Sequence, residues 1–238
     1  MSVADKLTTV AENVPKVYEA GKQTEYGRFW DAYQLNGKRT DYDHAFAGAG
    51  WNTETFHPKY DIKPKSGYMM FRYFPATIDM VEWLKELGVT FDNSNNTSVA
   101  YMFFACNFTR IDTVNLCKIS GTTGDMFAYS SNLHTIDKII CQEKTAWTSN
   151  TFTSCSNLAN LTIEGVIGGN VSFKACPLTA ESAKSIISAL KDYSGTDKEY
   201  TYSVTFSAST LELLEAEGAT APGGLTWTEY IKAKRWNY

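Results

Sequence analysis

A short apolar pattern recurs four times between residues 103 and 178, and it restricts the possible folds of this chain more than any other feature. Each copy begins with a Phe, has a small residue three positions later and continues with one or two apolar residues at steps of three, and two copies are one residue short in the middle. The copies cover residues 103–111, 127–136, 152–161 and 173–178. Their leading Phe residues are 24, 25 and 21 positions apart. A period of roughly 20–50 residues is typical of proteins built from stacked repeats.

One repeat of this length cannot bury its own apolar face, so neighbouring repeats must stack their side chains into continuous rows. The apolar residues that end each copy predict one short strand per repeat, and these strands would align as a parallel sheet. We therefore predict an α/β fold: a short solenoid with a parallel strand ladder, an N-terminal helix and a mixed α/β C-terminal cap.

The five cysteines fit this picture as packing residues. Cys106, Cys155 and Cys176 occupy the small position of the repeat, where the remaining copy has Ser130. A position that accepts either Cys or Ser is a slot for a small side chain, and free Cys is among the most buried residue types. We expect buried free thiols. Because no Cys-x-x-Cys pair occurs, we expect no zinc site and no other cofactor.

Residues 1–40 are predicted to form a helical attachment or coiled-coil segment. Apolar residues from Val3 to Val17 follow one another at steps of four and three, the spacing of a coiled-coil seam. Pro15 would kink this helix or open a second one. Two interpretations stay open: the helix mediates self-association or attachment, or it packs on its own body.

The rest of the chain divides into three parts. Residues 41–98 contain degenerate first repeats and an N-terminal cap, with Phe46 and Phe71 as leading residues 25 positions apart. Residues 99–178 hold the repeat array, and residues 179–238 form the C-terminal cap. Within the cap, the apolar spacing predicts helices at 179–193, 209–217 and 226–234 and a strand at 200–206.

The charge and hydropathy of the chain limit the classes of partner that it can bind and the cellular location that we expect for it. The net charge is −4, so the chain has no excess of Lys and Arg to neutralise phosphates, and we expect no nucleic-acid partner. No apolar run approaches the roughly 18 residues that span a bilayer, so we expect no membrane insertion. The first residues carry no secretory signal, which predicts that the protein stays in the cytoplasm until release and then acts in a virion or outside the cell.

No arrangement of residues predicts catalysis, and we expect a protein that is not an enzyme. What remains is the exposed side of the strand ladder, because neighbours of buried strand residues face outward. Two aligned rows of candidate binding residues result: Arg110, Thr135 and Asn160 in one, and Asp112, Asp137 and Thr162 in the next. The alternatives are an ordinary solvated face, or a glycan hydrolase in which Asp112 and Asp137 act as paired carboxylates.

The repeat resembles the leucine-rich repeats of the BspA type, in which a Phe follows each turn and a Cys or Ser comes three residues later. Residues 127–136 and 152–161 match this pattern in full, and the other two copies match with a one-residue deletion. The leader at residues 3–22, residues 45–62 and residues 162–168 also look like a narrower group, the leucine-rich-repeat proteins of prophages in Gram-positive gut bacteria. This resemblance implies a virion or tail-associated recognition protein, and it supplies no catalytic or binding residue.

Together these observations predict a non-enzymatic phage structural, tail-associated or adhesion protein. Its repeat surface would bind a bacterial surface protein or glycan, and its N-terminal helix would contact other virion proteins or a second copy of the chain. The alternative is a host module that uses leucine-rich repeats for protein–protein interaction.

Overall fold

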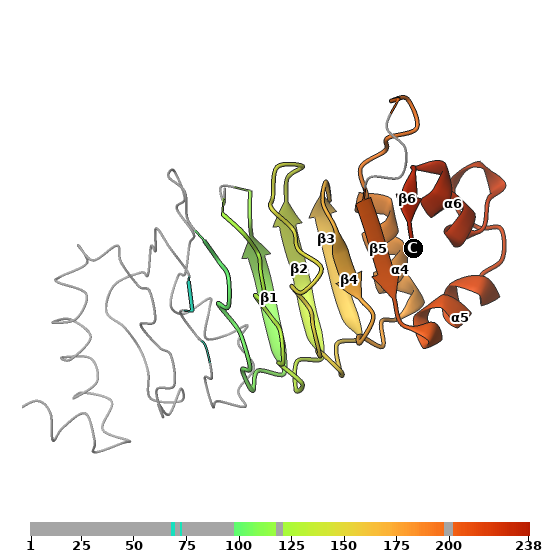
Figure 1. Ribbon diagram of the computed structural model, residues 1–238. Helices are drawn as coiled ribbons and strands as arrows, with labels where there is room; N and C mark the ends of the chain where they lie inside the picture. The colour runs from blue at the N-terminus through green and yellow to red at the C-terminus, as the bar shows by residue number, and fades with distance from the viewer. Residues whose placement is uncertain (1–67, 70–71, 73–97, 118–120, 198–201) are drawn as a thin grey trace, which may run out of the picture.

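The structure is a computed structural model, and it describes residues 68–69, 72, 98–117, 121–197 and 202–238. This part of the chain is a mixed α/β fold with two parallel sheets and three α-helices, and neither sheet closes into a barrel (Figure 1). The predicted N-terminal helix lies outside the described residues, as do Phe46 and Phe71.

The first sheet contains one strand from each of three successive repeats, as the sequence predicts. Its strands are β1 (Arg110–Asn115), β2 (Thr135–Cys141) and β3 (Asn160–Gly165), paired in parallel in that order. Their inward side chains are buried, and these are Ile111, Val114, Ile136, Ile139, Leu161 and Ile163.

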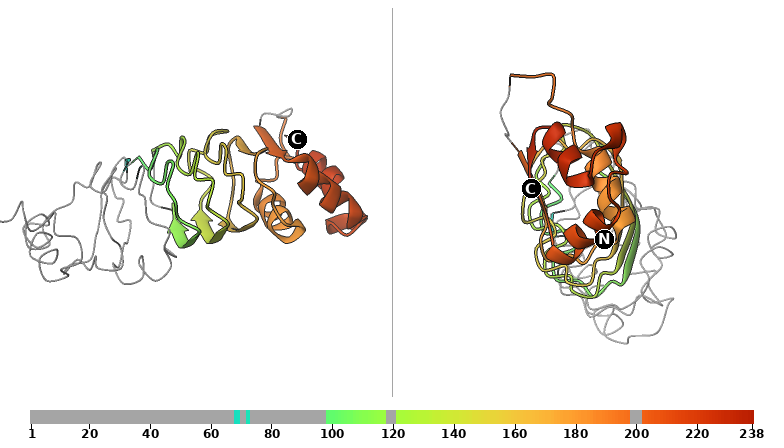
Figure 2. Two further views of the ribbon diagram at one scale, coloured as in Figure 1. Left: turned by 90° about the horizontal axis from the view of Figure 1, so that it is seen from below. Right: turned by 90° about the vertical axis from the view of Figure 1, so that its right-hand side faces the viewer.

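The second sheet lies on the opposite side of the described body (Figure 2). It consists of β4 (Val171–Phe173), β5 (Tyr202–Phe206) and β6 (Trp236–Asn237), also paired in parallel. The sequence predicts β5 within residues 200–206, whereas β6 was not predicted. The buried side chains fill the space between the two sides.

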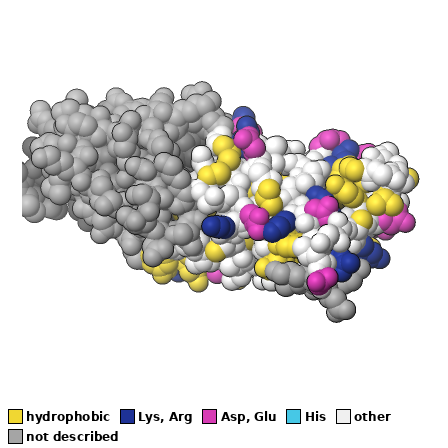
Figure 3. All heavy atoms as spheres, turned by 90° about the horizontal axis from the view of Figure 1, so that it is seen from above, with side chains coloured by type: hydrophobic (Ala, Val, Ile, Leu, Met, Phe, Trp, Pro, Cys, Tyr) yellow, Lys and Arg dark blue, Asp and Glu magenta, His cyan; other side chains and the backbone are white. Residues whose placement is uncertain are grey.

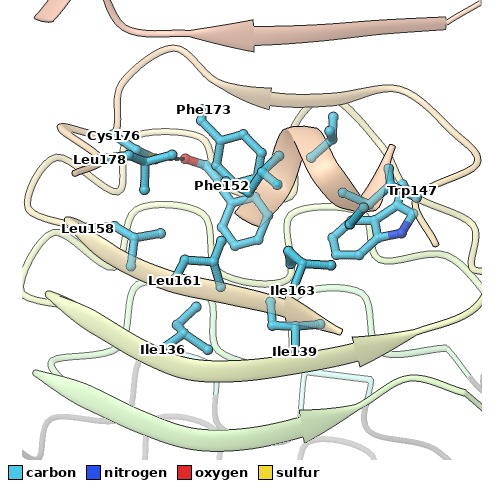
Figure 4. Close-up of a cluster of buried hydrophobic side chains, with 14 of the residues drawn as sticks. Ile136, Ile139, Trp147, Phe152, Leu158, Leu161, Ile163, Phe173, Cys176 and Leu178 are labelled. Atoms are coloured by element: carbon cyan, nitrogen blue, oxygen red, sulfur yellow. Dashed lines mark hydrogen bonds between the residues drawn. The ribbon is translucent and has the colours of Figure 1, made fainter. Parts of the chain in front are cut away.

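A row of stacked Phe rings runs through this interior. Phe103, Phe127, Phe152, Phe173 and Phe206 have successive ring centroids 5.4, 5.3, 4.7 and 6.0 Å apart. Figure 4 shows two of these rings packed over the inward side chains of β2 and β3. The repeat pattern predicts the first four rings, and the structure adds Phe206, which follows Phe173 after 33 residues.

The small position of each repeat supplies a hydrogen bond as well as space. The side chains of Ser130, Cys155 and Cys176 donate to the carbonyl oxygen of the leading Phe in the preceding repeat, at 2.6, 3.0 and 3.8 Å respectively. Ser130 Oγ also accepts from the backbone N–H of Cys106 at 3.1 Å. The carbonyls of Phe127 and Phe152 also accept backbone N–H groups within their own repeats, so the small donor adds a hydrogen bond between repeats.

All five cysteines are free thiols, as predicted, and Cys117 alone among them is not buried. Burial raises the pKa of Cys155 to about 12 and that of Cys141 to about 11. It also raises the pKa of Cys176. These thiols therefore stay protonated at neutral pH and act as packing residues.

The array ends in a cap of three helices. These are α4 (Ala180–Ala189), α5 (Ala208–Ala216) and α6 (Trp227–Ala233), with a short 3-10 turn at Pro222–Gly224. Helices α4 and α6 fall within the residues predicted for them, and α5 begins one residue before its predicted range of 209–217. Each begins at a Thr or Ser whose side chain accepts a backbone N–H of the first turn, namely Thr179, Ser207 and Thr226.

Lys234 joins the last helix to the first. Its ammonium group is buried and donates to the carbonyl oxygens of Ile187, Ser188 and Leu190 at 2.8–3.0 Å, at the C-terminal end of α4. The last carbonyls of a helix lack partners within the helix and carry a partial negative charge. The ammonium group of Lys234 supplies both the missing hydrogen-bond donors and a positive charge. The sequence offered no indication of this role.

The Phe row predicts a large and position-specific loss of stability. Phe127 is fully buried between two stacked rings. Phe127→Ala should lower the free energy of unfolding by about 3–5 kcal/mol because it opens a cavity in a close-packed interior. Leu213→Ala, at a side chain that is 47% exposed, is the control and should change it by less than about 0.5 kcal/mol. Equal midpoints for both variants in urea denaturation would contradict the stacking role.

Thiol labelling should distinguish Cys117 from the four buried cysteines. At pH 8, iodoacetamide should modify Cys117 first, because the other thiols are buried, and in Cys141, Cys155 and Cys176 a raised pKa also removes the reactive thiolate. Peptide mass spectrometry over time measures the order. In urea all five should react at similar rates, and fast labelling of Cys155 in the folded protein would show that its site is open.

Candidate binding surface on the first sheet

The first predicted row of binding residues is aligned across the sheet. Arg110 pairs with Thr135, and Thr135 pairs with Asn160, as parallel neighbours. Thr135 and Asn160 are half-buried, and Arg110 is exposed. The one-residue deletion in the repeat at 103 does not disturb this alignment, since β1 and β2 keep a regular register.

The second predicted row is interrupted. Ile136 pairs with Leu161 and Ile139 pairs with Ile163, so a register shift leaves two residues of β2 opposite Thr162 alone. Asp137 therefore shares the space above Thr162 with Lys138. Such a bulge bends the strand and re-aims its side chains. Asp112 lies in β1, and its side chain is outside the described part of the structure.

Ion pairs connect the strands across this surface. Both carboxylate oxygens of Asp137 accept from Arg110, with the shortest contact, from Nη2 to Oδ2, at 2.5 Å. One strand further along, Lys138 Nζ lies 2.9 Å from a carboxylate oxygen of Glu164. The two rows of binding residues predicted from the sequence did not include Lys138 and Glu164. The register shift that exposes Lys138 cannot be recognised from the spacing of the apolar residues.

Helix α4 covers the far edge of the sheet. The hydroxyl oxygen of Ser182 accepts from the N–H of Leu161 at 2.9 Å, and that of Ser185 accepts from the N–H of Ile163 at 3.0 Å. These side chains take the place of a fourth strand and satisfy donors that an open edge would leave unpaired. Two serines three residues apart, on the helix face toward β3, are the signal that could have predicted this contact.

A shallow groove lies where the start of α4 meets this surface. Its volume is about 210 Å³, and its polar lining residues are Thr135, Asp137, Asn160, Thr162, Thr179, Glu181 and Ser182. Four of the six predicted site residues therefore share one concave surface. Glu181, on the rim, pairs with Lys184 at 2.6 Å and raises the pKa of that lysine.

The groove is lined by polar side chains of several kinds. It presents hydroxyl, amide and carboxylate groups, which bind sugars, peptides and other polar partners. Both carboxylate oxygens of Asp137 accept hydrogen bonds from Arg110, which fixes the orientation of this carboxylate in the groove. Among the described residues, no group of three or more His, Cys, Asp or Glu side chains could hold a metal ion.

The role of α4 at the sheet edge can be measured directly. Ser182→Ala should lower the free energy of unfolding by about 1–3 kcal/mol, because the buried N–H of Leu161 loses its acceptor. Ser188→Ala, on the exposed side of the same helix, is the matched control and should have little effect. If both variants unfold at the same urea concentration, the hydroxyl is not required at the edge.

Comparisons with known proteins identify no relative. No family model matches the chain, and no curated protein or solved structure matches it. Within the described segments, every helix is too short or too polar to cross a membrane.

Proposed function

We propose that the protein is a non-enzymatic phage structural protein, tail-associated or adhesive, that binds a component of the bacterial envelope. The recognition surface is the outer face of β1, β2 and β3, on a short leucine-rich-repeat solenoid of the BspA type. The observation that carries the proposal is the row of Arg110, Thr135 and Asn160, aligned on a rigid parallel sheet.

The stacking between repeats supports the solenoid. Backbone N–H groups in one repeat donate to carbonyls in the next, as from Phe103 to Met126 at 2.8 Å and from Phe127 to Thr151 at 2.9 Å. A bond of the same kind joins Met69 to Ala100 at 3.1 Å, so the stacking extends back to residue 69. A body in which each repeat contacts its neighbours is the arrangement of solenoid proteins.

The shape of the surface favours an extended partner. Small-molecule sites are typically clefts of about 300–1,000 Å³, and the groove beside α4, at about 210 Å³, is smaller. The paired charges on the sheet give no single-sign patch, and positive and negative side chains also lie next to one another on the face seen in Figure 3. A mixed polar face suits a glycan or a protein more than a polyanion such as DNA.

In this proposal, the N-terminal segment attaches the protein to the virion. The spacing of apolar residues between Val3 and Val17 supports a helix that pairs with a second copy or with another virion protein. The protein then acts in the virion or outside the cell.

Blocking the sheet should abolish binding. Thr162 is exposed at the centre of the groove wall, and a Trp there would cover neighbouring polar groups. Full-length Thr162→Trp should lose at least about tenfold in affinity for purified cell envelopes of Gram-positive bacteria. A sedimentation assay with fluorescently labelled protein measures the bound fraction.

Glu212→Trp, on the exposed side of α5, is the matched control and should bind as the unmodified protein does. Removal of residues 1–35 should leave envelope binding intact and abolish self-association in light scattering. Equal binding by the two Trp variants would rule out the sheet as the recognition surface.

A further inference from the structure

Tyr129 combines an unfavourable backbone conformation with exposure. Its φ is 63°, in the left-handed region that is disfavoured for residues with a Cβ, and the side chain is 54% exposed. The same conformation occurs immediately before the small position in the neighbouring repeats, at Ala105 and Ser154. Three successive repeats therefore share this conformation with three different side chains, so the backbone does not require an aromatic ring, and the interior does not bury one here.

Tyr129 ends a row of aromatic rings on the face opposite β1–β3. The ring centroids of Tyr101 and Phe104 are 5.5 Å apart, and those of Phe104 and Tyr129 are 5.2 Å apart. The backbone N–H of Tyr129 donates to the carbonyl oxygen of Thr153 at 2.7 Å, so the next repeat lies directly beside it. There Ser154 stands at the equivalent position, and the row of rings stops.

The next repeat carries a groove of about 380 Å³ whose lining includes Thr153 and Ser154, so Tyr129 borders it through Thr153. Its lining side chains include the hydroxyls of Ser149, Thr153, Ser154 and Ser172 and the amine of Lys174. Among the described residues that line it, Lys174 carries the only charge. Its volume falls in the range of about 300–1,000 Å³ that is usual for small-ligand sites.

We infer that Tyr129 and this groove bind an acidic saccharide. The exposed ring offers a flat apolar face to the C–H face of a sugar ring. The four hydroxyls can exchange hydrogen bonds with sugar hydroxyls, because each can both donate and accept. Lys174 supplies the cation for a carboxylate on the sugar. This site is on a different face from the one proposed above for envelope binding, and it does not depend on that proposal.

Calorimetric titration of the full-length protein with a tetrasaccharide of galacturonic acid tests the inference. The fully methyl-esterified tetrasaccharide is the matched probe, since it keeps the rings and loses the charge. We expect measurable binding of the acid form, at least about fivefold weaker binding of the ester, and weakening of the acid form by added salt. Failure of the acid to bind, or equal affinity for acid and ester, would overturn the inference.

Variants separate the contributions of the ring and the amine. Tyr129→Ala should weaken binding of the acid by about tenfold, whereas Tyr129→Phe should retain most of it because the stacking face remains. Lys174→Gln should reduce affinity for the acid to that for the ester. Tyr238→Ala, at another tyrosine that is 45% exposed, is the control.

The sheet variant Thr162→Trp separates the two proposals. It should leave saccharide binding unchanged, so loss of envelope binding in that variant and loss of saccharide binding in Tyr129→Ala report on different surfaces. Equal effects of Tyr129→Ala and Tyr238→Ala on the acid would also overturn the inference.

Discussion

The stacking of one Phe per repeat is the interaction on which the rest of the structure depends. Ring separations of 4.7–6.0 Å are only slightly longer than, or equal to, the roughly 4.8 Å spacing of neighbouring β-strands, so one ring can stack for each strand added. The carbonyl of each of the first three Phe residues then receives the small donor of the following repeat. Side-chain packing and backbone hydrogen bonding thus fix the same alignment.

That alignment also determines what happens at the end of the array. A parallel sheet that ends at β3 leaves backbone N–H groups unpaired along its edge. A further strand would pair them but would expose an unpaired edge of its own. Helix α4 resolves it with two serine hydroxyls, and its first turn forms a wall of the groove beside the sheet. The position of α4 therefore both closes the edge of the sheet and shapes the candidate binding surface.

Much of this architecture could be predicted, because in stacked repeats the buried residues recur in the sequence at a nearly constant interval. The positions of Phe127, Cys155 and Ile136 follow from spacing alone, and so does the row of Arg110, Thr135 and Asn160. Other features leave no periodic trace. The register shift at Asp137 and Lys138 depends on how β2 fits β3, and the partners of Lys234 lie more than 40 residues earlier in the chain.

In three of the four repeats a residue with positive φ precedes the small position, and its side chain differs from repeat to repeat. Ala105, Tyr129 and Ser154 share one backbone conformation and differ in everything else. This is why the sequence pattern treats the position as variable, although the backbone there is fixed.

Lys234 has a consequence for the order in which the cap can form. The carbonyls at the end of α4 receive their donor from a residue that lies 44–47 positions later in the chain. Contacts between such distant residues form slowly, because the intervening chain must first be brought into a closed loop. The repeats can stack as they leave the ribosome, one on the next, while the end of α4 remains exposed until Lys234 arrives. Completion of the cap therefore requires Lys234 to be in place beside the end of α4.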